Sequence, residues 1–235
     1  MIDFTPSSEQ QMLIDSVHRF AELEVRPVAH KADEDASTPQ EIIAKGWNLG
    51  IVPGLIPEEY GGYAGGESAV TAVLALEELG WGDVSIALNI LAPATFALAI
   101  LHAGSESQKK QFLPKFCDQK RPLLSSALME PSIKFDPAEP ETVAQELDGS
   151  IKISGEKTYV PDADGAEAII VYAKASNTES VRGYIVHHSS KGMNVGEKNR
   201  LMGLRSLPTF RVALDAVNVQ LVVQLVNSLI ARFLA

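Results

Sequence analysis

The side chains most able to do chemistry on their own are five histidines, one cysteine and the adjacent acids at 58–59 and 77–78. The adjacent histidines at 187–188 lie in a stretch typical of a strand, so they point to opposite faces and do not share a metal. No pattern of basic neighbours marks Cys117 as an activated thiolate, and we expect it to be a small buried apolar side chain. The acid pairs at 58–59 and 77–78 are expected to be solvated rather than catalytic, because adjacent side chains on a helix diverge by about 100°.

Motifs of self-contained catalytic or nucleotide sites are absent from the sequence. It contains no GxGxxG, GxxxxGK[ST], GxSxG, HExxH or CxxC, which argues against a Rossmann site, a P-loop, an α/β-hydrolase elbow and the usual zinc sites. Four basic side chains surround the stretch MGLRSLPTF and form either a solvated rim or a loop that contacts phosphate groups: Lys198, Arg200, Arg205 and Arg211.

Composition and charge describe a folded protein with an acidic first half. The chain has 235 residues, 46% of them hydrophobic and 21% charged, and a net charge of −10. Residues 1–120 hold 8 basic against 17 acidic side chains, which makes nucleic acid and anionic lipid poor partners. A single cysteine and the lack of a basic-then-apolar leader predict a cytoplasmic location.

The first 120 residues show helical patterns. Thr5 and Thr38 each precede a proline, and Ser105 stands three residues before Gln108, so we expect these three hydroxyls to cap helices. An apolar stripe at helical spacing follows the first cap: Leu13, Val17, Phe20 and Leu23. A third helical segment is expected to bury Phe112, Leu113 and Phe116. These elements predict a helical domain over residues 1–120.

After Arg121 the hydrophobic period changes from helical to alternating. An Asp-Gly pair at 148–149 separates two such runs and predicts a hairpin. Further strand patterns follow, so we expect an antiparallel β domain over 121–219 and an α+β fold class. The residues at 220–235 place polar side chains on one side and a broad apolar face on the other, which predicts a short C-terminal helix docked on the chain or on a partner subunit. It is too short and too interrupted for a membrane span.

Six segments, in this order and spacing, resemble the acyl-CoA dehydrogenase family: GLIPEEYGG, LALEELGWGDVSIAL, GSESQKKQFLPKF, ALMEP, DGSIKISGEKTYV and MGLRSLPTFRVALDAVNV. The resemblance covers residues 1–219. It implies a helical N-terminal domain, a β-barrel-like middle domain and, in complete members, a C-terminal helical domain that builds the oligomer. It also implies FAD and an acyl-CoA thioester as ligands, with a glutamate removing the α-proton and the β-hydrogen passing to the flavin as hydride.

The resemblance carries flavin contacts onto two segments. In the first, Ser126, Leu128 and Met129 take the flavin-contacting positions, and Met129 replaces a threonine of the family pattern. Further along, Lys134 and Phe135 add bulk where the family has glycine and serine, and Phe135 is assigned to substrate binding. Backbone amides can still bind the flavin edge, because every residue except proline carries a donor.

The second segment is Tyr159–Asp162. Tyr159 can offer an aromatic face to the flavin. Pro161 replaces a threonine and has neither a hydroxyl nor an amide hydrogen, so a weakened flavin site is expected here. Arg205, within the basic stretch, is assigned to substrate binding.

No catalytic base is assigned by the resemblance. Glu130 matches the structural glutamate of the family pattern, and the family's long C-terminal helical domain is replaced by sixteen residues after Val219. Two readings stay open. One is an FAD-dependent oxidoreductase acting on the CH–CH bond of an acyl-CoA thioester, incomplete alone. The other is a non-catalytic, flavin-deficient binding or assembly subunit of a heteromeric complex, with the C-terminal helix as the oligomer contact.

Overall fold

The computed structural model describes residues 5–63, 69–147, 150–178 and 180–223. Two compact units divide the chain. The first, called here the helical unit, comprises Met1–Leu91, Cys117–Arg121 and Arg200–Leu207. The second, the sheet unit, comprises Ala92–Phe116, Pro122–Asn199 and Pro208–Ala235. The chain therefore crosses between the units several times, and each unit is described separately.

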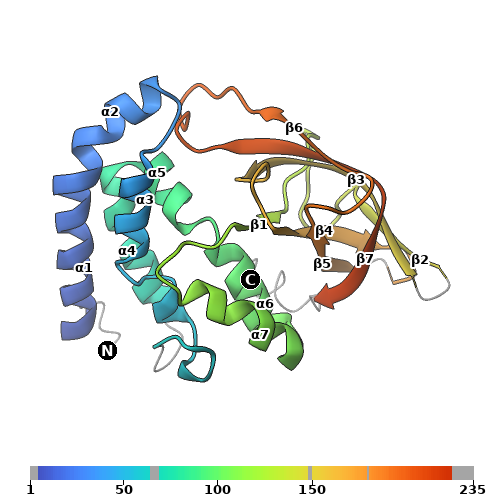
Figure 1. The fold of residues 1–235 in the computed structure, drawn as a ribbon, viewed down its shortest axis with the longest axis horizontal. Helices are drawn as coiled ribbons and strands as arrows, with labels where there is room; N and C mark the ends of the chain where they lie inside the picture. Colours follow the sequence, from blue (N-terminus) through green and yellow to red (C-terminus); the bar gives the residue numbers. More distant parts are fainter. Residues whose placement is uncertain (1–4, 64–68, 148–149, 179, 224–235) are drawn as a thin grey trace. The chain divides into compact units, whose positions relative to one another are not determined.

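The helices of the helical unit pack around an apolar core. Its buried side chains include Val17, Ala75, Leu79, Ile86 and Ile90. Figure 1 shows these helices in blue and cyan. In chain order the elements are α1 (Ser8–Phe20), the π-helical turn η1 (Ala21–Val25), α2 (Arg26–Glu34), α3 (Gln40–Trp47), the short 3-10 helices η2 (Pro53–Leu55) and η3 (Glu58–Tyr60), α4 (Ala69–Gly82) and α5 (Val84–Leu91).

The buried face of the first helix differs from the predicted stripe at its end. Val17 and Phe20 are buried as the apolar stripe predicts, but Leu23 is 58% exposed. Ala21 and Val25, the first and last residues of the π-helical turn η1, are buried instead. The prediction for Leu23 is therefore wrong, because at about 100° per residue Leu23 lies about 120° around the helix from Val17.

Two of the predicted helix caps are also wrong. The first helix is capped by Ser7, whose hydroxyl and Gln10 form a reciprocal capping box, and not by Thr5. The third begins after Pro39 without a side-chain cap. Thr38 is buried and its hydroxyl donates to the carbonyl of Ser206, 3.3 Å away in the same unit. The hydroxyl that the local pattern assigned to the helix end is thus hydrogen-bonded to a group remote in sequence.

The cap at Ser105 is confirmed. Its hydroxyl accepts from the Gln108 amide and the Gln108 side chain accepts from the Ser105 amide. Replacing Ser105 with alanine is expected to lower the free energy of unfolding by about 1 kcal/mol, because the first turn loses an acceptor for its free amides. Urea denaturation measures the change. The control Ser105→Asp keeps an acceptor and should lose much less; an equal loss in both variants would contradict the capping role.

In its described residues the sheet unit combines two α-helices and a short 3-10 helix with seven strands, drawn in green to red in Figure 1. Phe96, Phe112 and Phe116 are buried together beside the sheet. Burial of Phe112, Leu113 and Phe116 is confirmed. The elements are α6 (Ala94–Ala103), α7 (Glu106–Phe112), η4 (Leu113–Phe116), β1 (Leu124–Ala127), β2 (Val143–Leu147), β3 (Ser150–Pro161), β4 (Ala168–Ala175), β5 (Val181–His187), β6 (Met193–Lys198) and β7 (Thr209–Val223).

The strand pairings form a closed ring. They run from β4 through β2, β3, β7 and β5 back to β4, while β6 extends the edge of β7. Strands β2 and β3 pair antiparallel with Leu147 opposite Ser150, which confirms the predicted hairpin. Both β1 and β2 run parallel to β4, so the sheet is mixed rather than purely antiparallel. The α+β class and the barrel-like curl are confirmed.

The start of the predicted C-terminal helix is wrong. Residues 220–223 continue strand β7, and their backbone pairs with β5, with Val223 opposite Gly183. A short apolar run fits a strand as well as a helix, and here an open strand edge decides. The remainder of that prediction, 224–235, lies outside the described residues. Within the described part of the chain no single helix is long and apolar enough to cross a membrane; only α5 and α6 together, as a bent pair, meet that requirement.

Candidate functional site

The first predicted flavin segment leaves the sheet at the end of β1. Ser125 and Ala127 are buried on one side of the strand, whereas the next residues, Leu128 and Met129, are 39% and 47% exposed. Ser126 lies on the other side of the strand, and its hydroxyl oxygen is buried without a hydrogen-bond partner. An unpaired buried hydroxyl is costly, so this oxygen is a natural point of contact for a ligand.

The structure brings the second predicted segment beside the first. The amide of Thr158 donates to the carbonyl of Met129 at 2.9 Å. The hydroxyl of Ser125 donates to the carbonyl of Pro161 at 2.6 Å. These two hydrogen bonds hold the segments together, although they lie about thirty residues apart in the sequence. The carbonyl of Pro161 already accepts one of the two bonds.

Tyr159 is presented by a bulge in β3. Pairing with β7 passes from Lys157 opposite Val212 to Val160 opposite Phe210, which leaves an additional residue on β3. Tyr159 lies within this bulge with φ of 52° and is 47% exposed, while Val160 beside it is buried. A left-handed backbone costs a bulky residue free energy, and such strain with an outward side chain is typical of functional positions.

These segments contact a buried ion pair that no sequence motif indicated. The ammonium of Lys157 lies 2.7 Å from a carboxylate oxygen of Glu130, and the two side chains are 0% and 3% exposed. The ammonium also donates to the carbonyl of Leu128 at 3.1 Å. The Glu130 oxygens accept from the amides of Glu141 and Thr142 at 2.7 and 2.9 Å. The site therefore rests on a buried ion pair, and backbone groups hydrogen-bond both of its members.

The pair's titration follows from this environment. Burial raises the pKa of Glu130, but hydrogen bonds from Lys157, Thr142 and Glu141 outweigh it, and the pKa lies below its ordinary value of 4.5. Burial lowers the pKa of Lys157, and Glu130 only partly offsets this. One signal could have revealed the pair: Lys157 continues the inward positions of Ile151 and Ile153 along β3, and a charge at an inward position requires a partner.

The two predicted substrate residues lie in different units. Phe135 is half-buried in a turn of the sheet unit, where its amide donates to the Ser132 carbonyl at 3.2 Å. Arg205 belongs to the helical unit, where its guanidinium lies 3.9 Å from Asp33 and donates to the Glu34 carbonyl at 3.3 Å. The assignment of both residues to substrate binding stays a prediction.

The residues present suit a flavin ring better on its face than on its edge. Exposed Leu128, Met129 and Tyr159 offer an apolar and aromatic surface, and the Ser126 oxygen offers one unpaired polar contact. Met129 and Pro161 have no hydroxyl, and the Pro161 carbonyl is occupied by Ser125. The group therefore fits, with fewer side-chain hydrogen bonds than the family pattern supplies.

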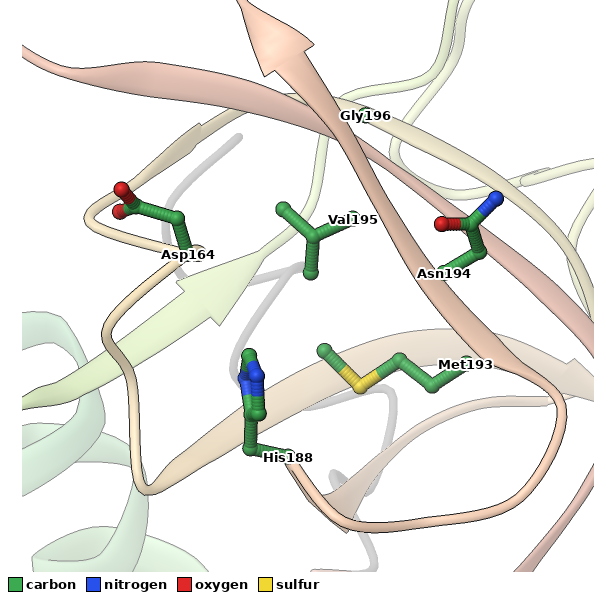
Figure 2. Close-up of a pocket in the computed structure, with 6 residues that line it drawn as sticks. All are labelled: Asp164, His188, Met193, Asn194, Val195 and Gly196. Carbon is green, nitrogen blue, oxygen red and sulfur yellow. The ribbon is translucent and has the colours of Figure 1, made fainter.

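A separate hollow of about 370 Å³ lies on the sheet unit, lined by Asp164, His188 and the β6 stretch 193–196. Figure 2 shows that the Asp164 carboxylate and the His188 ring do not point toward one another. Among the described residues, no group of three or more His, Cys, Asp or Glu side chains could hold a metal ion.

Cys117 is partly buried, its thiol lies 3.8 Å from the Tyr60 carbonyl, and burial raises its pKa.

Comparison with known proteins gives a consistent family. Residues 7–120 match the acyl-CoA dehydrogenase N-terminal domain and residues 125–217 match the middle domain. A cyclohex-1-ene-1-carbonyl-CoA dehydrogenase of Syntrophus aciditrophicus is 28% identical over 216 residues, which cover 91% of this chain and 52% of the relative. The chain thus spans about half the length of the curated relatives it matches.

Solved structures agree. Butyryl-CoA dehydrogenase from Megasphaera elsdenii matches with a TM-score of 0.82 and 25% identity, covering 95% of this chain and 60% of that one. An acyl-CoA dehydrogenase from Bacillus anthracis, solved with FAD, matches with a TM-score of 0.79 and 26% identity, covering 98% and 40%. With both domain matches in order along the chain, this protein belongs to the acyl-CoA dehydrogenase family.

Proposed function

We propose that this chain supplies the flavin-ring surface of an FAD-dependent oxidoreductase that acts on the CH–CH bond of an acyl-CoA thioester. The observation that carries the proposal is the exposed set of Leu128, Met129 and Tyr159, presented by two segments that hydrogen bonds hold side by side. Two exposed apolar side chains next to a strained, outward-facing tyrosine favour an apolar or aromatic ligand over water.

In this proposal the chain's residues position and shield rather than react. Tyr159, Leu128 and Met129 exclude water from one face of the ring, and the Ser126 hydroxyl binds its edge. FAD, when bound, supplies the acceptor for the hydride that leaves the β-carbon of the thioester. The remaining requirement is a base for the α-proton.

Glu130 does not act as that base. Its carboxylate is buried, accepts three hydrogen bonds and has a lowered pKa, so it neither reaches a substrate nor holds a proton near neutral pH. We therefore propose that the base is supplied by a partner chain or by sequence that corresponds to the second half of the longer relatives. In the first case, an oligomer completes the site.

A second candidate function is favoured by Met129 and Pro161. Both positions lack the hydroxyl of the family pattern, and each missing buried contact costs about 1–3 kcal/mol of flavin binding. Under this alternative the chain is a flavin-deficient assembly subunit. A visible absorption spectrum of the purified chain with added FAD, before and after acyl-CoA thioesters, separates the two. Flavin that stays bound after free FAD is removed supports the enzyme, and bleaching by a thioester shows that the purified protein also contains a base; a chain that retains no flavin supports the assembly subunit.

Replacing Tyr159 with alanine tests the flavin surface directly. We expect the Kd for FAD to rise about threefold to tenfold, because a stacked aromatic contact is worth roughly 0.5–1.5 kcal/mol. Quenching of FAD fluorescence on titration with protein measures it. Alanine keeps the Cβ and thus the backbone strain, so folding stability should change little. Tyr159→Phe retains the ring and should bind as the natural chain does; a Kd unchanged in the alanine variant would remove Tyr159 from the site.

A further inference from the structure

We infer that Glu130 and Lys157 form a positioning device that sets the flavin-facing surface, an inference that rests on the proposed function. Neither side chain reaches solvent or a ligand, so neither is catalytic. Burying two charges costs several kcal/mol per ion, and apolar side chains of similar volume often give equal or greater stability. The specific contribution of the pair therefore lies in the backbone groups that its hydrogen bonds hold in place.

Together the two side chains fix the backbone on both sides of one loop, residues 131–140. Lys157 donates to the Leu128 carbonyl, which precedes the loop, and to Glu130 at its start. The two oxygens of Glu130 accept from the amides of Glu141 and Thr142, which follow it. Both ends of the loop 131–140 are thus tied to one carboxylate. An apolar pair could fill the same volume but could not bind a carbonyl and two amides.

Three successive residues of β3 then define the surface. Lys157 holds the Leu128 carbonyl, Thr158 holds the Met129 carbonyl, and Tyr159 turns outward in its left-handed bulge. The ammonium and the amide therefore fix two consecutive peptide units next to the residue that presents the ring. We expect loss of the ammonium to let Leu128 and Met129 move relative to Tyr159 without unfolding the sheet.

The first test measures local opening in the full chain. Lys157→Met removes both hydrogen bonds of the ammonium at nearly constant volume. Arg182→Met is the matched control, because Arg182 is a largely buried cation of the same unit that pairs with Glu146 at 3.0 Å. Hydrogen exchange at the Thr158 amide should accelerate about tenfold or more in Lys157→Met, beyond any global change in stability, and not in the control. Equal exchange in the two variants, after correction for stability, would overturn the inference.

The second test reads the flavin. Whether the natural chain binds FAD tests the proposed function. The exchange experiment needs no FAD and tests the positioning role. A failure of the proposed function can therefore be distinguished from a failure of this inference. If FAD binds, Lys157→Met should raise its Kd about tenfold and alter the shape of its visible absorption band, while Arg182→Met leaves both unchanged. Glu130→Gln keeps the shape and the Lys157–Leu128 bond and should lie between them. A natural Kd and band in Lys157→Met would show a purely structural pair.

Discussion

Replacing Glu130 with alanine is expected to lower the free energy of unfolding by about 3–5 kcal/mol, one of the largest effects of any single substitution in this chain. The change leaves the ammonium of Lys157 buried without its counter-charge and frees the amides of Glu141 and Thr142. Urea or thermal denaturation of the full chain measures the loss. A loss below about 1 kcal/mol, the value of an exposed pair, would mean that water reaches the site.

The pH dependence of stability provides the control. Because the pKa of Glu130 is lower in the folded chain than its ordinary 4.5, the carboxylate contributes stability above that pH, and the contribution is lost as pH falls through the folded value. In Glu130→Gln this component is missing. The stability difference between the natural chain and Glu130→Gln should therefore shrink as pH falls below 4.5. A difference independent of pH would exclude an ionised Glu130.

Replacing Phe96 with alanine is expected to cost about 3–5 kcal/mol as well, through a cavity rather than a charge. Phe96 of α6 is fully buried, and its ring centroid lies 5.3 Å from that of Phe112 and 6.1 Å from that of Phe116. Removing the ring leaves both partners without their central contact. Chemical denaturation of the full chain measures the loss.

The matched control for Phe96 is a large side chain in the same unit that makes no core contact. Ile133 is fully exposed in its loop, so Ile133→Ala should change stability by no more than about 0.5 kcal/mol. Phe96→Leu retains part of the volume and should lie between the two. Similar stabilities for Phe96→Ala and Ile133→Ala would mean that α6 does not share the core of the sheet.

Local patterns in the sequence predicted those features that neighbours along the chain determine. The capping box at Ser105 depends on residues three apart, and the hairpin around 148–149 depends on a two-residue turn between alternating runs. The same approach failed where a distant group competes. Thr38 binds a carbonyl 168 residues away, and residues 220–223 join an open strand edge. The spacing of residues along the sequence carries no information about either interaction.

For the site, the resemblance of the sequence motifs to the family pattern predicts that Ser126, Leu128, Met129 and Tyr159 contact a flavin. How the two segments meet depends on the folded chain, through the Thr158–Met129 and Ser125–Pro161 hydrogen bonds. The tertiary structure also decided that the charges of Glu130 and Lys157 are buried against one another. The physical reason is that motif and period encode local backbone geometry, whereas desolvation and pairing of charges depend on groups that folding brings together from distant parts of the chain.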